Sequence, residues 1–466
     1  MKIRNREELL SGGAIAVREI LLAVLEGSLR TLDGYELIRQ HVQCDGDVLC
    51  IGRLRWDLRQ WRRLYVIGAG KAGNAMARAL DQVLGRRIHA GLVIVKELES
   101  SAHLSRIELV TGGHPLPNQA GQQAAERILR WVDQAGPDDL FISVISGGSS
   151  ALMSCPVPPI TLQDEALVTD QLLRSGARIL EINAVRRHIS ATNGGRLAQR
   201  IEARGAQMIN LIISDLAGTP PTTDPAEPTA FYGTPVAPDA TTLGDARRAL
   251  RKYDLLERAP PSVTHYLARD DPARETPKAF GPTVRQFVLA TCADGCEAAR
   301  EAGNRLGLPS LVLTTHLEGE SRHAGAFLAA VAKEVASNQR PIAPPCLLLA
   351  SGETTTRVEG DAGRGGPSQE LALGFALEVD GWTGMGIAAL DTDGSDGPTA
   401  NAGGIADGRS LARAADVGLD LYQRLQAHDS AAALEATGDA IVTGPTGTNV
   451  CDLNVVYISS HKGDSS

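Results

Sequence analysis

The stretch Leu64-Tyr-Val-Ile-Gly-Ala-Gly-Lys-Ala-Gly73 decides the fold class of this chain. It is typical of a buried strand, a tight glycine turn and the start of a helix, and Gly68, Gly70 and Gly73 match the spacing G-x-G-x-x-G. In such a turn the backbone N–H groups can approach an anion closely, and the helix start adds a favourable dipole. Lys71 stands inside the turn and supplies a positive charge suited to phosphate or carboxylate. The stretch therefore predicts an anion-binding turn in an α/β domain.

Strand and helix patterns alternate on both sides of this turn. We predict strands at 64–67, 92–95, 140–145, 208–214, 287–290, 311–313, 346–350 and 385–390, and helices at 6–30, 71–84, 120–132, 245–256, 295–305, 325–336 and 368–377. Such alternation indicates βαβ units and a largely parallel sheet. The length of 466 residues favours two such α/β domains.

Proline marks the predicted connection between the domains. The segment 218–238 is too rich in proline for a helix or a central strand, and a second Pro/Arg-rich stretch covers 259–282. We therefore predict an N-terminal domain at 1–240, a connection at 241–282 and a C-terminal domain at 283–466.

Composition excludes several classes of protein. No apolar stretch approaches the ~20 residues of a membrane span, and the N-terminus lacks the apolar run of a secretory signal, so we expect a cytoplasmic protein. A net charge of −9 argues against nucleic acid or an anionic membrane as a partner. The seven cysteines include no C-x-x-C pair, which favours reduced thiols over a disulfide framework or a zinc site.

Further loops rich in glycine and hydroxyl groups follow other predicted strands. Ser146-Gly-Gly-Ser-Ser150 follows the strand at 140–145 and can form an anion-binding nest, although the G-x-S-x-G elbow of serine hydrolases is absent. Arg364 lies between glycines before a helix, where it has the freedom to meet a phosphate. Several such loops in one chain point to a phosphate-rich ligand.

Carboxylates also follow predicted strands, at Asp215 and in the segment 391–396. The latter, DTDGSD, resembles the start of a calcium loop, but Ala402 occupies the position where an EF-hand needs glutamate. Carboxylates placed in this way can hold Mg2+ on phosphates or accept a substrate proton. The alternative interpretation of each is that it stabilises a turn or caps a helix and has no role in catalysis. His114 and His188 are interpreted as structural residues.

These segments together resemble the class II glycerate 2-kinase family, whose C-terminal part is called MOFRL. The resemblance is carried by VIGAGKAG (66–73), TGGHPLPN (111–118), ISGGSSALM (145–153), INAVRRHIS (182–190), NGGRLA (193–198), SGETTTRVEG (351–360), GRGGPSQE (363–370), LDTDGSDGPT (390–399) and TGPTGTNVCDL (443–453). It implies a Rossmann-like parallel-sheet N-terminal domain and a smaller α/β domain of MOFRL type, with the site in the cleft between them. The implied reaction is phosphorylation of D-glycerate at its 2-hydroxyl with ATP and Mg2+ as cofactors.

On this basis the candidate residues can be assigned to roles. Catalytic candidates are Lys71, Arg364, Asp215 and Asp393; binding candidates are Gly68, Gly70, Ser146, Gly147, Gly148, Ser149, Ser150, Glu353, Thr446 and Asn449; metal candidates are Asp215 and Asp393. The expected partners are ATP and glycerate or a similar hydroxy acid, with neither nucleic acid nor membrane. A homodimer is left open.

The chain departs from the family pattern at three ligand loops. The segment after Asp215 is longer than usual, and Asp224 or Glu227 is the stand-in for the family's second aspartate there. Pro367-Ser368 replaces an Arg-Asn pair. Asn401 replaces an aspartate. These departures leave open a related sugar acid as substrate. Two other functions stay as alternatives: an NAD(P)H-dependent hydroxypyruvate reductase, with Glu97 or Glu99 as ribose acceptor, and a non-catalytic metabolite-binding relative.

Overall fold

The computed structural model describes residues 1–99, 104–217, 235–358 and 362–460. The chain forms two compact units. Unit 1 comprises Met1–Leu37, Ser214–Thr223 and Ala290–Ser466, and unit 2 comprises Ile38–Ile213 and Asp224–Leu289. These units differ from the division predicted along the sequence, because the first helices pack on the C-terminal half of the chain and not on the parallel sheet that follows them.

Unit 2 contains a six-stranded parallel sheet. Its spatial order is β6 (Ile107–Thr111), β5 (Ala90–Val95), β4 (Arg63–Ala69), β7 (Asp139–Ile145), β8 (Gln207–Ile213) and β9 (Val284–Ala290). In order of appearance along the chain this is 3-2-1-4-5-6, the order of the Rossmann fold. The predicted Rossmann-like fold class is therefore confirmed. The order reverses between β4 and β7, which is where such sheets bind ligands.

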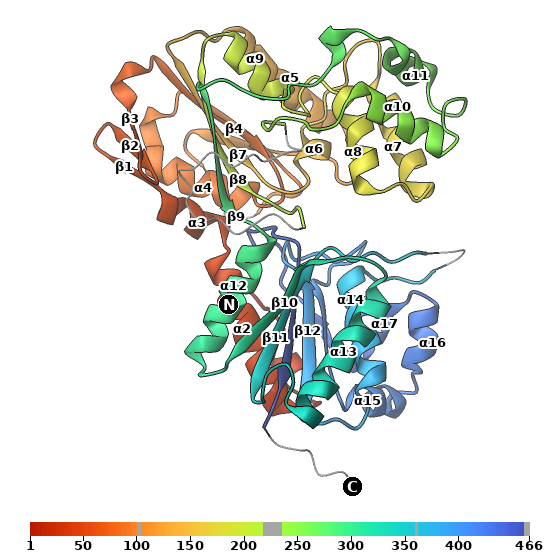
Figure 1. Ribbon diagram of the computed structural model, residues 1–466. Coiled ribbons are helices and arrows are strands. Elements are labelled where there is room, and N and C mark those ends of the chain that lie inside the picture. The colour runs from red at the N-terminus through yellow and green to blue at the C-terminus, as the bar shows by residue number, and fades with distance from the viewer. Residues whose placement is uncertain (100–103, 218–234, 359–361, 461–466) are drawn as a thin grey trace. The chain divides into compact units, whose positions relative to one another are not determined.

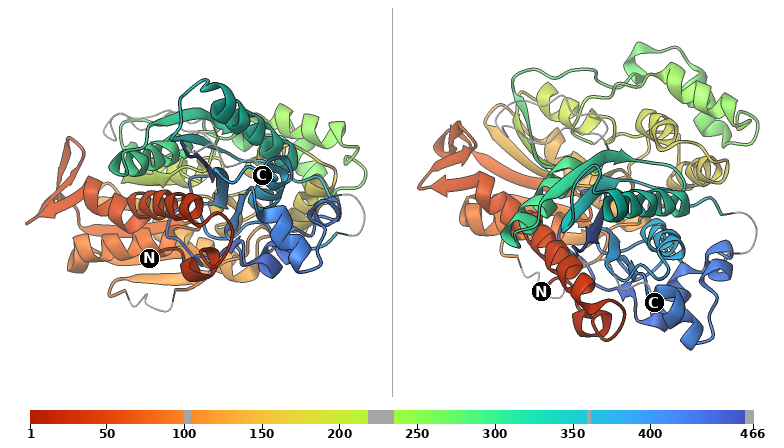
Figure 2. Two further views of the ribbon diagram at one scale, coloured as in Figure 1. Left: turned by 90° about the horizontal axis from the view of Figure 1, so that it is seen from below. Right: turned by 60° about the horizontal axis from the view of Figure 1, so that its bottom comes forward.

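Helices and a small antiparallel ribbon complete unit 2 (Figures 1 and 2). The ribbon consists of β1 (Val42–Asp45), β2 (Val48–Ile51) and β3 (Leu54–Asp57). Helix α3 (Gly34–His41) carries the chain from unit 1 into unit 2. The other helices of unit 2 are α4 (Gly73–Leu84), α5 (Gln119–Asp133), α6 (Ser149–Leu152), α7 (Leu162–Arg174), α8 (Ile179–His188), α9 (Arg196–Ala203), α10 (Leu243–Lys252) and α11 (Pro261–Ala268). Helices α7, α8, α10 and α11 share a separate apolar core.

Unit 1 contains a six-stranded mixed sheet. Its order is β10 (Ser310–Leu317), β11 (Cys346–Gly352), β15 (Asp452–Ile458), β12 (Met385–Asp391), β13 (Gly403–Asp407) and β14 (Ala440–Ile441). Only β10 and β11 run parallel, and every other neighbouring pair is antiparallel. The predicted second α/β domain is confirmed in class, but its sheet is not mainly parallel. Strand β15, the C-terminal strand among the described residues, lies between β11 and β12 in the interior of the sheet.

Helices cover both faces of the unit 1 sheet (Figure 1). Helices α2 (Ile15–Thr31) and α12 (Cys292–Arg305) pack on one face against Leu347 and Leu349 of β11. Helices α13 (Ser321–Asn338) and α14 (Pro367–Glu378) pack on the other face against Leu348 and Ala350. Successive strand residues point to opposite sides of the sheet. The run of consecutive apolar residues in β11 therefore makes both faces apolar. The remaining helices of unit 1 are α1 (Arg6–Leu9), α15 (Ser410–Asp416), α16 (Leu421–Gln426) and α17 (Ser430–Thr437).

A buried ion-pair cluster anchors α2 in unit 1. The predicted single helix at 6–30 is interrupted at Gly13, which adopts a left-handed φ of 75°. The side chain of Arg18 is fully buried, with Nε 2.5 Å from Oδ2 of Asp407 and Nη1 2.6 Å from Oδ1 of Asp439. A β-carbon at position 13 would collide with both Arg18 and Asp407. The glycine turn therefore makes room for this cluster, which periodicity alone does not reveal.

Among the described residues, no helix is both long enough and apolar enough to cross a membrane.

Candidate active site

In unit 2, the turns after β4 and β7 are joined at the point where the strand order reverses. The N–H of Lys71 donates to the carbonyl of Gly147 (2.9 Å), and the N–H of Ala72 donates to Oγ of Ser146 (3.0 Å). Gly70 is required because a β-carbon there would lie 2.1 Å from Ser146 Oγ. The structure therefore brings together two sequence motifs that are more than seventy residues apart.

His114 lies at the same turn. An ideal β-carbon on Gly148 would lie 3.0 Å from Cδ2 of His114 and 3.4 Å from Cγ of Lys71. Gly148 itself is left-handed, with φ of 83°. The sequence interpretation of His114 as a structural residue overlooked this proximity, which only the ends of β4, β6 and β7 together create.

His188, by contrast, is fixed inside the protein as expected. The side chain is fully buried, and its ring nitrogens lie 2.7 Å from the carbonyl oxygen of Ala184 and 2.7 Å from Oε1 of Glu275. Burial alone would raise the pKa of Glu275, but hydrogen bonds from His188, Lys278 and backbone N–H groups lower it to about 2. This pair connects α8 to the segment that precedes β9.

In unit 1, carboxylates lie at neighbouring ends of three adjacent interior strands, β11, β15 and β12. Asp452 at the start of β15 pairs in register with Asp391 at the end of β12, and Glu353 directly follows β11. Burial and the negative charges of Asp391, Asp396, Glu353 and Asp393 raise the pKa of Asp452 well above its usual range. Asp393 and Glu353 are separate candidates in the sequence and Asp452 is not one, because the antiparallel entry of β15 beside β12 is not visible in the sequence.

Asp396 has a structural role in the same region. Its carboxylate accepts hydrogen bonds from the backbone N–H groups of Ser368 (3.1 Å) and Gln369 (2.8 Å) at the start of α14. Burial raises the pKa of Asp396 to about 6 in spite of these hydrogen bonds. A carboxylate at this position satisfies N–H groups that the helix itself leaves unpaired.

Asp215 lies beside the loop that leads into β15. Nδ2 of the buried Asn449 donates to Oδ2 of Asp215 at 3.3 Å. Thr446, in the same loop, is also buried, and its hydroxyl donates to the carbonyl of Thr392. The predicted residues Asp215, Thr446 and Asn449 therefore belong to one region of unit 1.

Arg364 is exposed. Its Nη2 donates to Oε2 of Glu435 at 3.0 Å, and its backbone N–H donates to Oδ1 of Asp429. The side chain of Arg364 is 62% exposed, so this ion pair is open to solvent.

Comparison with known proteins identifies the family. Residues 20–268 match the model of a domain of unknown function, DUF4147, and residues 346–452 match the MOFRL family. A protein of Pyrococcus horikoshii named glycerate 2-kinase is 37% identical over 452 residues, which cover 97% of this chain and 99% of that relative. The chain belongs to the glycerate 2-kinase family.

Solved structures agree with this assignment to the glycerate 2-kinase family. The crystal structure of glycerate kinase from Thermotoga maritima aligns with a TM-score of 0.77 and 32% identity, covering 95% of this chain and 99% of that one. A crystal structure of a Pyrococcus horikoshii protein aligns with a TM-score of 0.73 and 36% identity, covering 96% and 99%.

Two departures from the glycerate 2-kinase family pattern have structural roles. Pro367 is the first residue of α14, where a missing N–H costs nothing, and Ser368 donates its N–H to Asp396. Asn401 donates from Nδ2 to Oε1 of Glu435, the residue that also pairs with Arg364. The stand-ins Asp224 and Glu227 lie outside the described residues.

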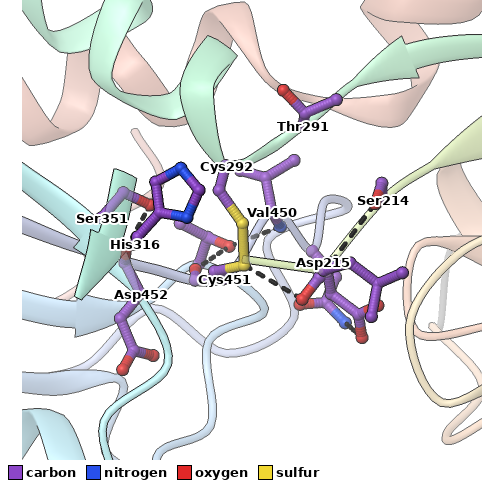
Figure 3. The surroundings of a disulfide bond; sticks show 12 residues. Ser214, Asp215, Thr291, Cys292, His316, Ser351, Val450, Cys451 and Asp452 are labelled. Atoms are coloured by element: carbon purple, nitrogen blue, oxygen red, sulfur yellow. Dashed lines mark hydrogen bonds between the residues drawn. A yellow bond between two sulfur atoms is a disulfide. The ribbon is translucent and has the colours of Figure 1, made fainter. Parts of the chain in front are cut away.

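A disulfide joins Cys292 to Cys451 in this member of the glycerate 2-kinase family (Figure 3). Cys292 is the first residue of α12, and Cys451 immediately precedes Asp452 of β15. Their α-carbons are 5.6 Å apart, within the range for disulfides. The expectation that all seven thiols are reduced is therefore wrong, because the fold brings together two cysteines 159 residues apart.

Replacing the pair in a Cys292→Ser/Cys451→Ser variant should lower the free energy of unfolding by about 2–4 kcal/mol, since the bond closes a long loop. Urea unfolding measures this effect, and Cys50→Ser on strand β2, outside the disulfide, is the control. Alkylation of the unreduced, denatured wild type should modify five of the seven cysteines. Modification of all seven would show that the bond does not form.

Proposed function

We propose that this protein is a kinase that transfers a phosphoryl group from ATP to the 2-hydroxyl of D-glycerate, or of a closely related sugar acid, with Mg2+. The observation that carries the proposal is the near full-length similarity to proteins named glycerate 2-kinase and D-glycerate 2-kinase, the latter 37% identical over 396 residues. The turn chemistry at the reversal of the parallel sheet supports it, because it offers a cation and backbone N–H groups to an anion.

Phosphoryl transfer depends mainly on positioning and on neutralising spread negative charge. Both ATP and glycerate are anions, so cations must offset their repulsion. In the proposal Lys71 supplies such a charge at the turn formed by Gly70 and Ser146, which would bind phosphate or the substrate carboxylate. Arg364 is the second cation, and its solvent-exposed pair with Glu435 can open at little cost.

The carboxylates of unit 1 fit Mg2+ by their chemistry. Mg2+ prefers oxygen ligands and is usually held in kinases by one or two carboxylates together with phosphate oxygens. Within the described ranges, no three His, Cys, Asp or Glu side chains form a metal site by themselves. In the proposal Asp393 holds Mg2+ at the strand ends where Asp391 and Asp452 pair in register, and Asp215 is the alternative ligand or the group that orients the 2-hydroxyl.

A hydroxypyruvate reductase is the second candidate, because two relatives from Agrobacterium vitis with that name are 38% identical over 397 residues. The close packing of Gly73 against Val93 and Val95 also agrees with the G-x-G-x-x-G reading. Lys71 argues against the reductase, because it occupies the turn where the dinucleotide motif binds the pyrophosphate with backbone N–H groups alone.

One pair of assays separates these functions. The purified protein is incubated with D-glycerate, ATP and Mg2+ while ADP release is followed, and in parallel with hydroxypyruvate and NADH. We expect ADP release, and 2-phosphoglycerate as the product. NADH oxidation without ADP release would replace the kinase with the reductase, and neither signal across a panel of sugar acids would favour a binding protein.

Arg364→Ala should lower kcat/KM for glycerate about tenfold, less than the loss expected for a buried cation, because water partly replaces an exposed guanidinium. Steady-state kinetics measure the loss. Arg300→Ala, which removes another exposed arginine in an ion pair of unit 1, is the matched control. Unchanged kinetics of Arg364→Ala would remove this residue from the mechanism.

A further inference from the structure

The Gly147–Ser150 turn presents backbone donors that the protein itself does not use. In the part of the chain that the structure describes, the N–H groups of Gly147, Gly148 and Ser150 have no protein acceptor. The N–H of Ser149, by contrast, donates to the carbonyl of Ser146 at 3.3 Å. Ser150 belongs to the first turn of the short helix α6 (Ser149–Leu152), where any helix leaves N–H groups without an intrahelical acceptor, and Gly147 and Gly148 add their own N–H groups just before it. Adjacent donors of this kind in a glycine turn can form an anion-binding nest.

The imidazole of His114 borders this nest by one particular edge. Cδ2 of His114 lies 3.0 Å and Nε2 lies 3.3 Å from the position that a β-carbon on Gly148 would take. The ring therefore presents its Cδ2–Nε2 edge to the turn. Cγ of Lys71 lies 3.4 Å from the same position, so a histidine and a lysine approach the turn at one glycine.

The loop that carries His114 is held at both ends. The N–H of Gly112 donates to the carbonyl of Val95 at 2.9 Å, and Asn118 caps α5 by accepting from the N–H of Gly121 at 2.9 Å. Gly113 has no space for a side chain, because a β-carbon would lie 2.3 Å from the carbonyl oxygen of Leu116. These contacts hold the backbone of the loop on both sides of His114, next to the Gly147–Ser150 turn.

We propose that His114 is a substrate-binding residue, which donates a hydrogen bond from Nε2 to an anionic group held by the Gly147–Ser150 turn and Lys71. This inference rests on the proposed kinase function and adds a residue to it. The anionic group is a carboxylate or a phosphoryl group, since both present oxygen acceptors of similar size. Lys71 gives charge without a fixed direction, whereas an imidazole N–H is directional and selects the orientation of the bound group.

The test compares His114→Ala, which removes the donor, with His114→Gln, whose amide can place an N–H near the position of Nε2. Steady-state kinetics are measured with D-glycerate and ATP varied separately. We expect kcat/KM to fall about 10- to 100-fold in His114→Ala and to recover several-fold in His114→Gln, with thermal stability unchanged. His89→Ala, which removes a histidine that packs edge-on against Tyr65, is the matched control and should keep normal kinetics.

A second measurement does not depend on turnover. The side-chain resonances of His114 in wild-type protein are followed by NMR during separate titrations with D-glycerate and with ADP, and are assigned by their loss in His114→Ala. A shift with D-glycerate alone identifies a carboxylate subsite, and a shift with ADP alone identifies a phosphate subsite. Normal kinetics of His114→Ala, or no shift with either ligand, would overturn the role of His114. Absence of turnover by the wild type would instead overturn the proposed function.

Discussion

Replacing Lys71 with alanine is expected to lower kcat/KM for glycerate phosphorylation at least ~100-fold, which corresponds to about 2.7 kcal/mol of lost transition-state stabilisation. The reason is the position of Lys71 in the turn that Gly70, Ser146 and Gly147 hold by hydrogen bonds and close contact. A charge in a preorganised turn acts on the developing negative charge without reorganisation at the moment of reaction.

Steady-state kinetics and a thermal unfolding curve check this prediction together. The melting temperature of Lys71→Ala should equal that of the wild type, because the lysine side chain is only half-buried. Lys252→Ala, which removes an exposed lysine paired with Glu181 in the same unit, is the control and should leave both quantities unchanged. Near-normal turnover by Lys71→Ala would exclude Lys71 from the reaction.

The largest expected loss of stability follows from Arg18→Met, at about 3–5 kcal/mol of unfolding free energy. Methionine fills much of the same space but leaves the fully buried carboxylate of Asp407 without its cation. Asp439 keeps its ion pair with a second arginine, Arg413, so we expect most of the lost unfolding free energy to come from the unpaired carboxylate of Asp407. Urea unfolding measures the effect.

Two further variants make the Arg18 prediction specific. Arg30→Met, on the same helix, removes an exposed arginine whose pair with Glu26 spans one helical turn, and should cost well under 1 kcal/mol. Arg18→Met/Asp407→Leu should regain much of the loss, because it removes the buried charge together with its partner. A double variant as unstable as the single one would show that packing, and not charge, explains the effect.

The parts of the fold that local patterns encode were predictable from the sequence. The strand and turn from Leu64 to Gly73 lie in β4 and the start of α4, because glycine spacing and an apolar run act over a few residues. The predicted strand at 287–290 is also present, but it completes the parallel sheet of unit 2 as β9. Strand existence is a local property, whereas the choice of sheet depends on contacts distant in sequence.

The same distinction separates the predicted site residues from the missed ones. Lys71 and Ser146 follow strands of one parallel sheet, so their meeting at one edge could be expected from strand order. Asp452 and the disulfide of Cys451 depend on the antiparallel placement of β15, for which the sequence contains no local signal. The apparent losses at Pro367 and Asn401 are explained by the start of α14 and by Glu435, contacts that exist only in the folded chain.

The central position of β15 has a consequence for synthesis on the ribosome. Strand β15 is made after both of its neighbours, β11 and β12, which need it to complete their pairing. The sheet of unit 2 has all six strands once residue 290 has emerged, so it can form while translation continues. The apolar face of α2 packs partly on β15, so it stays incompletely covered until that strand is made. At ~5–20 residues per second this takes roughly 10–35 s more, during which the face is exposed to chaperones and proteases. A nascent chain that stops short of Asp452 should therefore be degraded even though its parallel sheet is complete.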